Sequence, residues 1–204
     1  MSQAKSATEP KVKLSKKEMR QREYVQQQRI SRLRWGAVGL VVLALLIYGG
    51  WQLLRPRPGI SVPQLSRTHI QVGDPHEPYN TDPPTSGPHA APVAAGFYTE
   101  APPDENLVHN LEHGYVVIWY NCTGLESNAC DELQRQIQDV MAEAGSASLF
   151  GEATKLIAVP RPTMDAQVAA TSWGRILKQN ALNGEELLAF IKYLRNQAPE
   201  SGAP

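Results

Sequence analysis

A run of twenty uncharged residues, 35–54, constrains this chain more than any other feature of its sequence. A helix of that length spans about 30 Å, the thickness of the hydrocarbon core of a bilayer. Trp35 and Trp51 lie near its ends, where aromatic rings favour the headgroup region. A buried core helix normally keeps a polar stripe, and here Gln52 is the one strongly polar side chain. We therefore predict a transmembrane helix at 35–54.

The charges on either side of this run predict its orientation. Residues 1–34 carry ten Lys and Arg against three acidic residues, whereas residues 59–204 carry eight basic and seventeen acidic residues. The positive-inside rule places the N-terminal tail in the cytoplasm and the C-terminal part outside. No small-residue cleavage site follows the run, so we expect an uncleaved, single-pass signal anchor. The acidic outer part argues against nucleic acid as a partner; we expect the lipid bilayer and other membrane proteins.

Local patterns divide the rest of the chain. The first dozen residues are polar and expected to be disordered. Ser15 and Glu18 form a capping-box pattern, so a helix is expected from about Lys16 into the apolar run. Prolines then break the helix. We expect a basic cytoplasmic tail at residues 1–34, the transmembrane helix at 35–54 and a linker at 55–64. An extracytoplasmic domain is expected at 65–198, followed by a disordered C-terminus at 199–204.

The periodicity of apolar residues predicts an α+β fold class for the outer domain, with one small mixed α/β domain. A long loop rich in proline and histidine occupies residues 60–105, and we expect it to be ordered around a site. Beyond it, the expected elements are a strand at 115–120, a helix at 130–145, strands at 155–159 and 167–173, and a helix that Asn183 opens. The order of these elements matches the second half of a thioredoxin-like fold by analogy.

Cys122 and Cys130 are the two cysteines of the chain. The first ends an expected strand and the second begins an expected helix, so a disulfide that closes the intervening loop is reasonable. The predicted orientation puts the pair in an oxidising compartment, where such bonds persist. The alternative is a pair of thiols that binds a soft metal or exchanges electrons, but the spacing lacks the C-x-x-C redox signature.

All five histidines, His69, His76, His89, His109 and His113, lie within one 45-residue segment. His109 and His113 are spaced i, i+4, which on a helical turn places both imidazoles on one face. We expect one turn at most, capped by Asp104 and ended by Gly114. The string from His109 to His113 also fits the H-x-x-E-H pattern of zinc peptidases, in which Glu112 would act on zinc-bound water.

The expected metal site comprises His89, His109 and His113, completed by Met164 or His76, with no catalytic residue assigned. Three imidazoles suit zinc or copper, and a thioether would favour copper(I). Glu112 would orient a histidine or act as a base. Two alternatives stay open at this stage: Met164 fills a gap in the core, and the histidines form a structural cluster that holds the loop.

Three motifs together resemble a known family. They are residues 79–89, Tyr-Asn-Thr-Asp-Pro-Pro-Thr-Ser-Gly-Pro-His; residues 109–114, His-Asn-Leu-Glu-His-Gly, before a strand; and residues 171–174, Thr-Ser-Trp-Gly. This combination is similar to the bacterial domain of unknown function 3105, over roughly residues 65–198. The resemblance implies an anchored extracytoplasmic domain on a bacterial cytoplasmic (inner) membrane, without an established activity. It supports treating the first two motifs as one site, and it transfers no ligand assignment.

These observations predict a membrane-anchored domain that binds copper or zinc, in metal handling or in assembly of a membrane complex. We expect binding rather than catalysis. The alternatives are a membrane-anchored zinc hydrolase that uses the H-x-x-E-H string, and a non-catalytic interaction module with structural histidines.

Overall fold

The computed structural model describes residues 16–54, 57–146 and 154–203. The chain divides into two compact units, residues 1–56 and residues 57–204. The expected disorder of the first dozen residues, and the capping serine at position 15, lie outside the described residues.

The first unit contains one long helix, α1 (Lys16–Leu54). Its start agrees with the helix expected from about Lys16. Within it, the segment Arg32–Trp51 has a mean hydropathy of 1.7 and none of it is buried, so its length and composition suffice to cross a membrane. A signal sequence would have the same properties, and the transmembrane assignment therefore stays a prediction.

The second unit is built on one mixed sheet of six strands in the order β1-β6-β5-β3-β4-β2. Strand β4 pairs in parallel with both of its neighbours, β3 and β2. Strand β5 pairs antiparallel with both of its neighbours, β3 and β6. The central strand β3 is buried along its whole length, as its continuous apolar sequence predicts. The strands are β1 (Ile60–Ser61), β2 (Gly96–Phe97), β3 (Val116–Tyr120), β4 (Leu156–Pro160), β5 (Val168–Ser172) and β6 (Arg175–Gln179).

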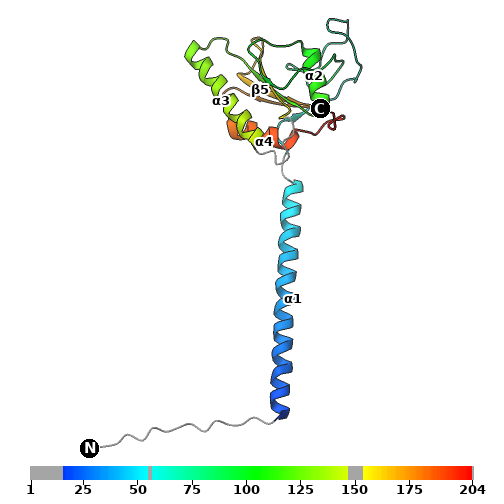
Figure 1. The fold of residues 1–204 in the computed structure, drawn as a ribbon, viewed down its shortest axis with the longest axis vertical. Helices are drawn as coiled ribbons and strands as arrows, with labels where there is room; N and C mark the ends of the chain where they lie inside the picture. The colour runs from blue at the N-terminus through cyan, green and yellow to red at the C-terminus, as the bar shows by residue number, and fades with distance from the viewer. Residues whose placement is uncertain (1–15, 55–56, 147–153, 204) are drawn as a thin grey trace, which may run out of the picture. The chain divides into compact units, whose positions relative to one another are not determined.

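Helices cover both faces of this sheet (Figure 1). Alternate β3 residues point to opposite faces, so Ile118 packs with α3 and α4, whereas Trp119 packs with α2. Asn183 caps the last helix, because its side chain accepts a hydrogen bond from the Glu186 backbone N–H at 3.1 Å. The helices are α2 (Asp104–Glu112), α3 (Ser127–Ser146) and α4 (Gly184–Leu194). The mixed α/β class is thus confirmed.

Several sequence expectations need correction. The sequence patterns did not predict strand β6. A two-residue turn with Gly174 at φ +70° joins it to β5. The charged Arg175 and Lys178 interrupt the apolar pattern that would have indicated a strand. Helix α2 has nine residues, not one turn. Its N-cap is Pro103 and no side chain caps it, so Asp104 does not have the expected capping role. The analogy with a thioredoxin-like fold concerns the order of elements alone.

The segment between β1 and β2 is bonded to α2 and also to the turn between β5 and β6, where the Gly174 backbone N–H donates to the Thr85 carbonyl. Residues 83–90 are buried. The Ala90 backbone N–H donates to the Glu105 carbonyl, and the Asn110 side chain bonds both the N–H and the carbonyl of Val93. Gly87 has φ +139°, and a Cβ there would lie 2.8 Å from the Tyr79 ring, so glycine is required where the segment turns toward α2.

Candidate metal centre

Helix α2 presents the first two groups of the site. His109 and Glu112 are three residues apart, and residues at this spacing lie on one face of a helix. Both are buried, with 8 % and 1 % of their surface exposed. The segment before β2 supplies the other groups, because it runs along α2 and brings His89 and His69 to the same place.

Four side chains converge there. One ligand atom from each of His69, His89, His109 and Glu112 lies within 4.8 Å of those of the other three. The rings of the three histidines meet edge to face, with centroids 4.5 to 5.1 Å apart. His89 is completely buried, whereas His69 is exposed. The group therefore has a buried interior and one side that faces solvent.

Backbone carbonyls determine which ring nitrogens are available. His89 Nδ1 lies 2.8 Å from the Gly87 carbonyl, and His109 Nδ1 lies 2.6 Å from the Ala90 carbonyl. A carbonyl can only accept, so each Nδ1 must carry the proton and donate it. In the neutral imidazoles, Nε2 therefore carries the lone pair. This is the arrangement by which proteins fix the tautomer of a metal-binding histidine.

The two buried partners then face each other as acceptors. His89 Nε2 lies 2.9 Å from Glu112 Oε2, and neither atom has a hydrogen-bond partner when the imidazole is neutral. Two lone pairs at this distance repel unless a proton, carried by the imidazole or by the carboxyl group, or a metal ion bound by both lies between them. The pair can therefore hold either a proton or a metal ion.

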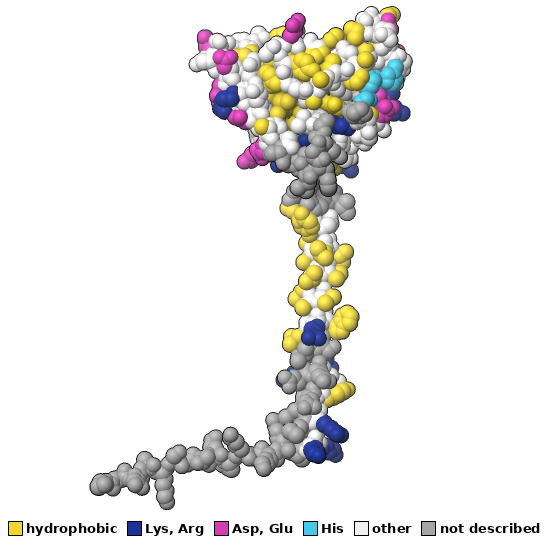
Figure 2. Space-filling view, in the orientation of Figure 1, with side chains coloured by type: hydrophobic (Ala, Val, Ile, Leu, Met, Phe, Trp, Pro, Cys, Tyr) yellow, Lys and Arg dark blue, Asp and Glu magenta, His cyan; other side chains and the backbone are white. Residues whose placement is uncertain are grey.

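His113 extends the group on the other side of His109. The Nε2 atoms of these two histidines are 3.0 Å apart, and His113 Nε2 is 3.9 Å from a carboxylate oxygen of Glu200. Arg67 contacts the carboxylate of the group, with its guanidinium 3.7 Å from Glu112 Oε1. The solvent-facing part of the site thus has one cationic and one acidic neighbour. Figure 2 shows histidine side chains at the surface of the second unit, next to acidic ones.

The electrostatics of the group favour a neutral His109. Burial lowers the pKa of His109 below its usual 6.5; the Ala90 carbonyl opposes this shift, and His89, His113 and His69 add to it. A neutral imidazole is the form that binds metal, so this environment keeps His109 available as a ligand near neutral pH.

The C-terminal segment packs beside the site. The Lys155 ammonium is buried and donates to the carbonyls of His113, Ser201 and Ala203 at 2.7 to 2.9 Å. The Glu200 backbone N–H donates to the Glu112 carbonyl. These bonds involve part of the terminus that we predicted to be disordered, and they hold Glu200 near His113.

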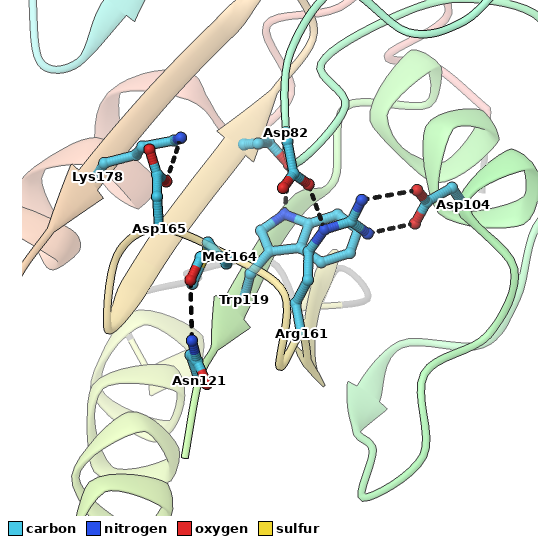
Figure 3. Close-up of polar contacts among 9 residues, drawn as sticks. Asp82, Asp104, Trp119, Asn121, Arg161, Met164, Asp165 and Lys178 are labelled. Atoms are coloured by element: carbon cyan, nitrogen blue, oxygen red, sulfur yellow. Dashed lines mark hydrogen bonds and ion pairs between the residues drawn. The ribbon is translucent and has the colours of Figure 1, made fainter. Parts of the chain in front are cut away.

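A separate polar cluster holds the start of α2 (Figure 3). The Arg161 guanidinium donates two hydrogen bonds to Asp104, at 2.7 and 3.0 Å, and one to Asp82, at 2.5 Å. It also lies over the Trp119 ring, 5.0 Å from its centroid. Asp82 precedes the buried segment that carries His89, and Asp104 begins the helix that carries His109. Arg161 therefore ties together the two backbones that supply the buried ligands.

The structure brings four of the predicted site residues together: His89, His109, His113 and Glu112. It also places His69 in the group. His69 is one of the five clustered histidines, but the sequence patterns do not assign it as a ligand. The concentration of all histidines in one segment was the signal that could have included it. Its pairing with His89 depends on an isolated β-bridge between residues far apart in the segment, which no local pattern predicts.

The two residues proposed to complete the site lie elsewhere. Met164 is buried in the apolar cluster that includes Trp119, and its carbonyl accepts a hydrogen bond from Asn121 (Figure 3). These contacts of Met164 do not support the predicted thioether ligand. His76 Nε2 lies 3.9 Å from Glu105, and its Nδ1 bonds the Glu77 carbonyl.

Cys122 and Cys130 form the predicted disulfide, with their Cα atoms 5.4 Å apart. Cys122 follows β3, as expected, whereas Cys130 lies within the first turn of α3 rather than at its start. The bond excludes free thiols at these positions. The alternative of a thiol metal site is thus not supported by the structure.

Comparison with known proteins identifies the family. A family model described as "Protein of unknown function (DUF3105)" matches residues 71–204, which is more than half of the chain. The chain belongs to this family. His89, His109, Glu112 and His113 lie within the matched segment, and His69 lies two residues before it. No curated protein and no solved structure matches the chain.

Proposed function

We propose that this member of the DUF3105 family binds one transition-metal ion, zinc or copper, through His69, His89, His109 and Glu112. The facing acceptors His89 Nε2 and Glu112 Oε2 carry the proposal. A buried carboxylate next to a buried, lone-pair-bearing imidazole is costly in the absence of a cation, and favourable when a cation binds both. The hydrogen bonds at both Nδ1 atoms leave the two Nε2 atoms as the nitrogens that can bind a metal ion.

The set of donors supports a borderline divalent ion. Three imidazole nitrogens and one carboxylate oxygen suit zinc(II) and copper(II), whereas copper(I) prefers sulfur. His113 is close enough to His109 to replace it or to hold it in position. The carboxylate supplies one negative charge, which partly balances the charge of a bound ion.

The proposed role is metal handling, or assembly of a membrane complex, outside a bacterial cytoplasmic membrane. Three features support it: an apolar segment of membrane-spanning length in α1, a basic N-terminal tail and the disulfide of the second unit. The exposure of His69 also favours handling over permanent storage, because an ion with one exposed ligand can be exchanged without unfolding the site.

A hydrolase is less well supported by the geometry. In the H-x-x-E-H mechanism the glutamate acts on zinc-bound water and is not itself a ligand. Here a carboxylate oxygen of Glu112 belongs to the group of ligand atoms and lies against His89. We therefore propose binding as the function.

Metal analysis of the full-length chain in detergent tests the proposal. After incubation with zinc(II) or copper(II) and desalting, the wild type should retain about one ion per chain. The double variant His89→Ala/His109→Ala should retain none, because the two buried nitrogens are lost. His76→Ala is the matched control, since it removes a histidine of the same segment that lies outside the group, and it should retain the ion.

Circular dichroism spectra would show whether each variant is folded. A wild-type chain without bound metal, or equal retention by the folded double variant, would contradict the proposal. A loss in His76→Ala as large as in the double variant would show that the ligands are assigned to the wrong histidines.

A further inference from the structure

The open side of the proposed metal site is formed by one short extended segment, which carries both Arg67 and His69. The segment is fixed by two backbone hydrogen bonds: the His89 N–H donates to the Thr68 carbonyl at 3.0 Å, and the Ile70 N–H donates to the His89 carbonyl at 2.9 Å. Residues two apart in an extended chain point to the same side. Both side chains accordingly reach the same group, Arg67 at Glu112 and His69 at the other histidines.

These two side chains differ from the buried ligands in their access to solvent. His69 is exposed, and 54 % of the Arg67 side chain is exposed, whereas at most 8 % of His89, His109 or Glu112 is. A ligand from solution would therefore meet the metal from the side of Arg67 and His69. The buried ligands would hold the ion while this exchange takes place.

Arg67 makes this entrance selective for charge. Its distance of 3.7 Å from Glu112 Oε1 is an ion-pair contact without a hydrogen bond of good geometry, so its N–H groups remain available to another acceptor. A guanidinium presents its donors in a planar fork that matches a carboxylate. Glu200, 47 % exposed, lies next to His113, whereas Arg67 lies next to Glu112 and on the same segment as His69, so the favourable position for an anion is next to His69.

We propose that the bound metal is exchanged with an anionic, carboxylate-bearing chelating ligand, which docks on Arg67 and displaces His69 from the metal. This inference rests on the metal site proposed above. In the exchange, the bond from His69 to the metal breaks as a bond from a ligand carboxylate oxygen forms. The oxidation state of the metal does not change, and the ion leaves with the chelator after the remaining three bonds are replaced in turn.

The test is a comparison of two chelators of different charge on the zinc-loaded full-length chain. Nitrilotriacetate is anionic and carries carboxylates, whereas phenanthroline is neutral. In Arg67→Ala, we expect zinc transfer to nitrilotriacetate to slow about fivefold at low ionic strength, the size of effect typical of one exposed charge. Transfer to phenanthroline should change little, and the difference between the chelators should shrink at 0.15 M salt.

Two variants serve as controls. Arg67→Lys keeps the charge and should recover part of the rate with nitrilotriacetate. Arg135→Ala removes an arginine of similar exposure, 59 %, that pairs with Glu132 and Asp139 on α3, and should leave both rates unchanged.

Equal changes with both chelators in Arg67→Ala would show that Arg67 affects the stability of the metal site and not the docking of anions. No change with either chelator would also overturn the inference. In both cases the metal content of the wild type would still support the proposed function. A wild-type chain that retains no zinc would overturn the proposed function and this inference together.

Discussion

Helix α2 is held at its two ends by two polar clusters of different character. At its start, the Arg161 guanidinium lies between two carboxylates, and it donates hydrogen bonds to both Asp82 and Asp104. At its end, His89 and Glu112 present facing acceptors with no hydrogen between them in the neutral state. The first cluster is complete by itself, and the second is complete only with a cation.

This difference indicates what each cluster contributes. An ion-pair network whose members all have partners fixes segments relative to one another. A preorganised group that needs a cation can instead serve as a binding site for that cation. The two are connected by the same helix and the same preceding segment, so the first cluster positions the second. Variants that affect one cluster at a time can test whether structure and binding are in fact separable.

The largest effect is expected when the complete cluster is broken. Arg161→Ala would leave Asp104 without its two hydrogen bonds and Trp119 without its cation. We expect the free energy of unfolding to fall by about 2–3 kcal/mol, less than for a fully buried pair because Asp82 and Asp104 are partly exposed. Urea unfolding in the presence of a chelator measures it, with Arg135→Ala as a control that should leave the free energy of unfolding nearly unchanged, because its ion pairs are exposed on the surface of α3.

At a temperature where Arg161→Ala is folded, its free energy of metal binding should change much less than its free energy of unfolding. If affinity fell more than about tenfold in the folded variant, the two clusters would act as one unit, and the comparison between them would be wrong.

A smaller effect is expected when the His89–Glu112 cluster is given its missing hydrogen bond, and here the free energy of unfolding should rise. Glu112→Gln replaces one facing acceptor by an amide that can donate to His89 Nε2. The metal-free protein should become more stable by about 1 kcal/mol, while zinc affinity falls by at least about tenfold because the anionic ligand is lost. Unfolding in chelator and competition for zinc measure the two quantities.

Glu105→Gln lies on the same helix outside the group and should change neither quantity. A Glu112→Gln protein that is less stable than the wild type without metal would show that the carboxylate is already satisfied, by a proton on His89. The cluster would then be complete without metal, like that of Arg161.

The smallest effect is expected from pH. Burial lowers the folded-state pKa of His109, so the unfolded chain binds more protons below its usual value of 6.5. The contribution of His109 to stability is therefore fully present above about pH 6.5, and it is lost as the pH falls from there through the folded-state pKa. Urea unfolding of the metal-free protein across this window would measure the slope.

His109→Gln should flatten this slope, since glutamine does not titrate. A wild-type stability that is constant between pH 6.5 and 5, or a slope unchanged in the variant, would contradict the environment assigned to His109.

The sequence by itself predicted those features that depend on local or repeating patterns. The long N-terminal helix, the strands β3, β4 and β5, the helices α3 and α4 and the disulfide all follow from runs, periods or spacings of a few residues. The pairing of His109 with His113 and the involvement of Glu112 follow from the 3.6-residue period of one helix.

The tertiary structure decided what completes the site. His69 joins His89 through a bridge across twenty residues, and the segment between them follows α2 because of hydrogen bonds that have no sequence signature. Met164, chosen for its chemistry, packs into an apolar cluster instead. Arg161 is a lone arginine after a strand, and its contacts with Asp82 and Asp104 join residues 57 or more positions apart. Local patterns report which residues share a face of one element, but they carry no information on which elements meet, because that depends on how the whole apolar surface is buried.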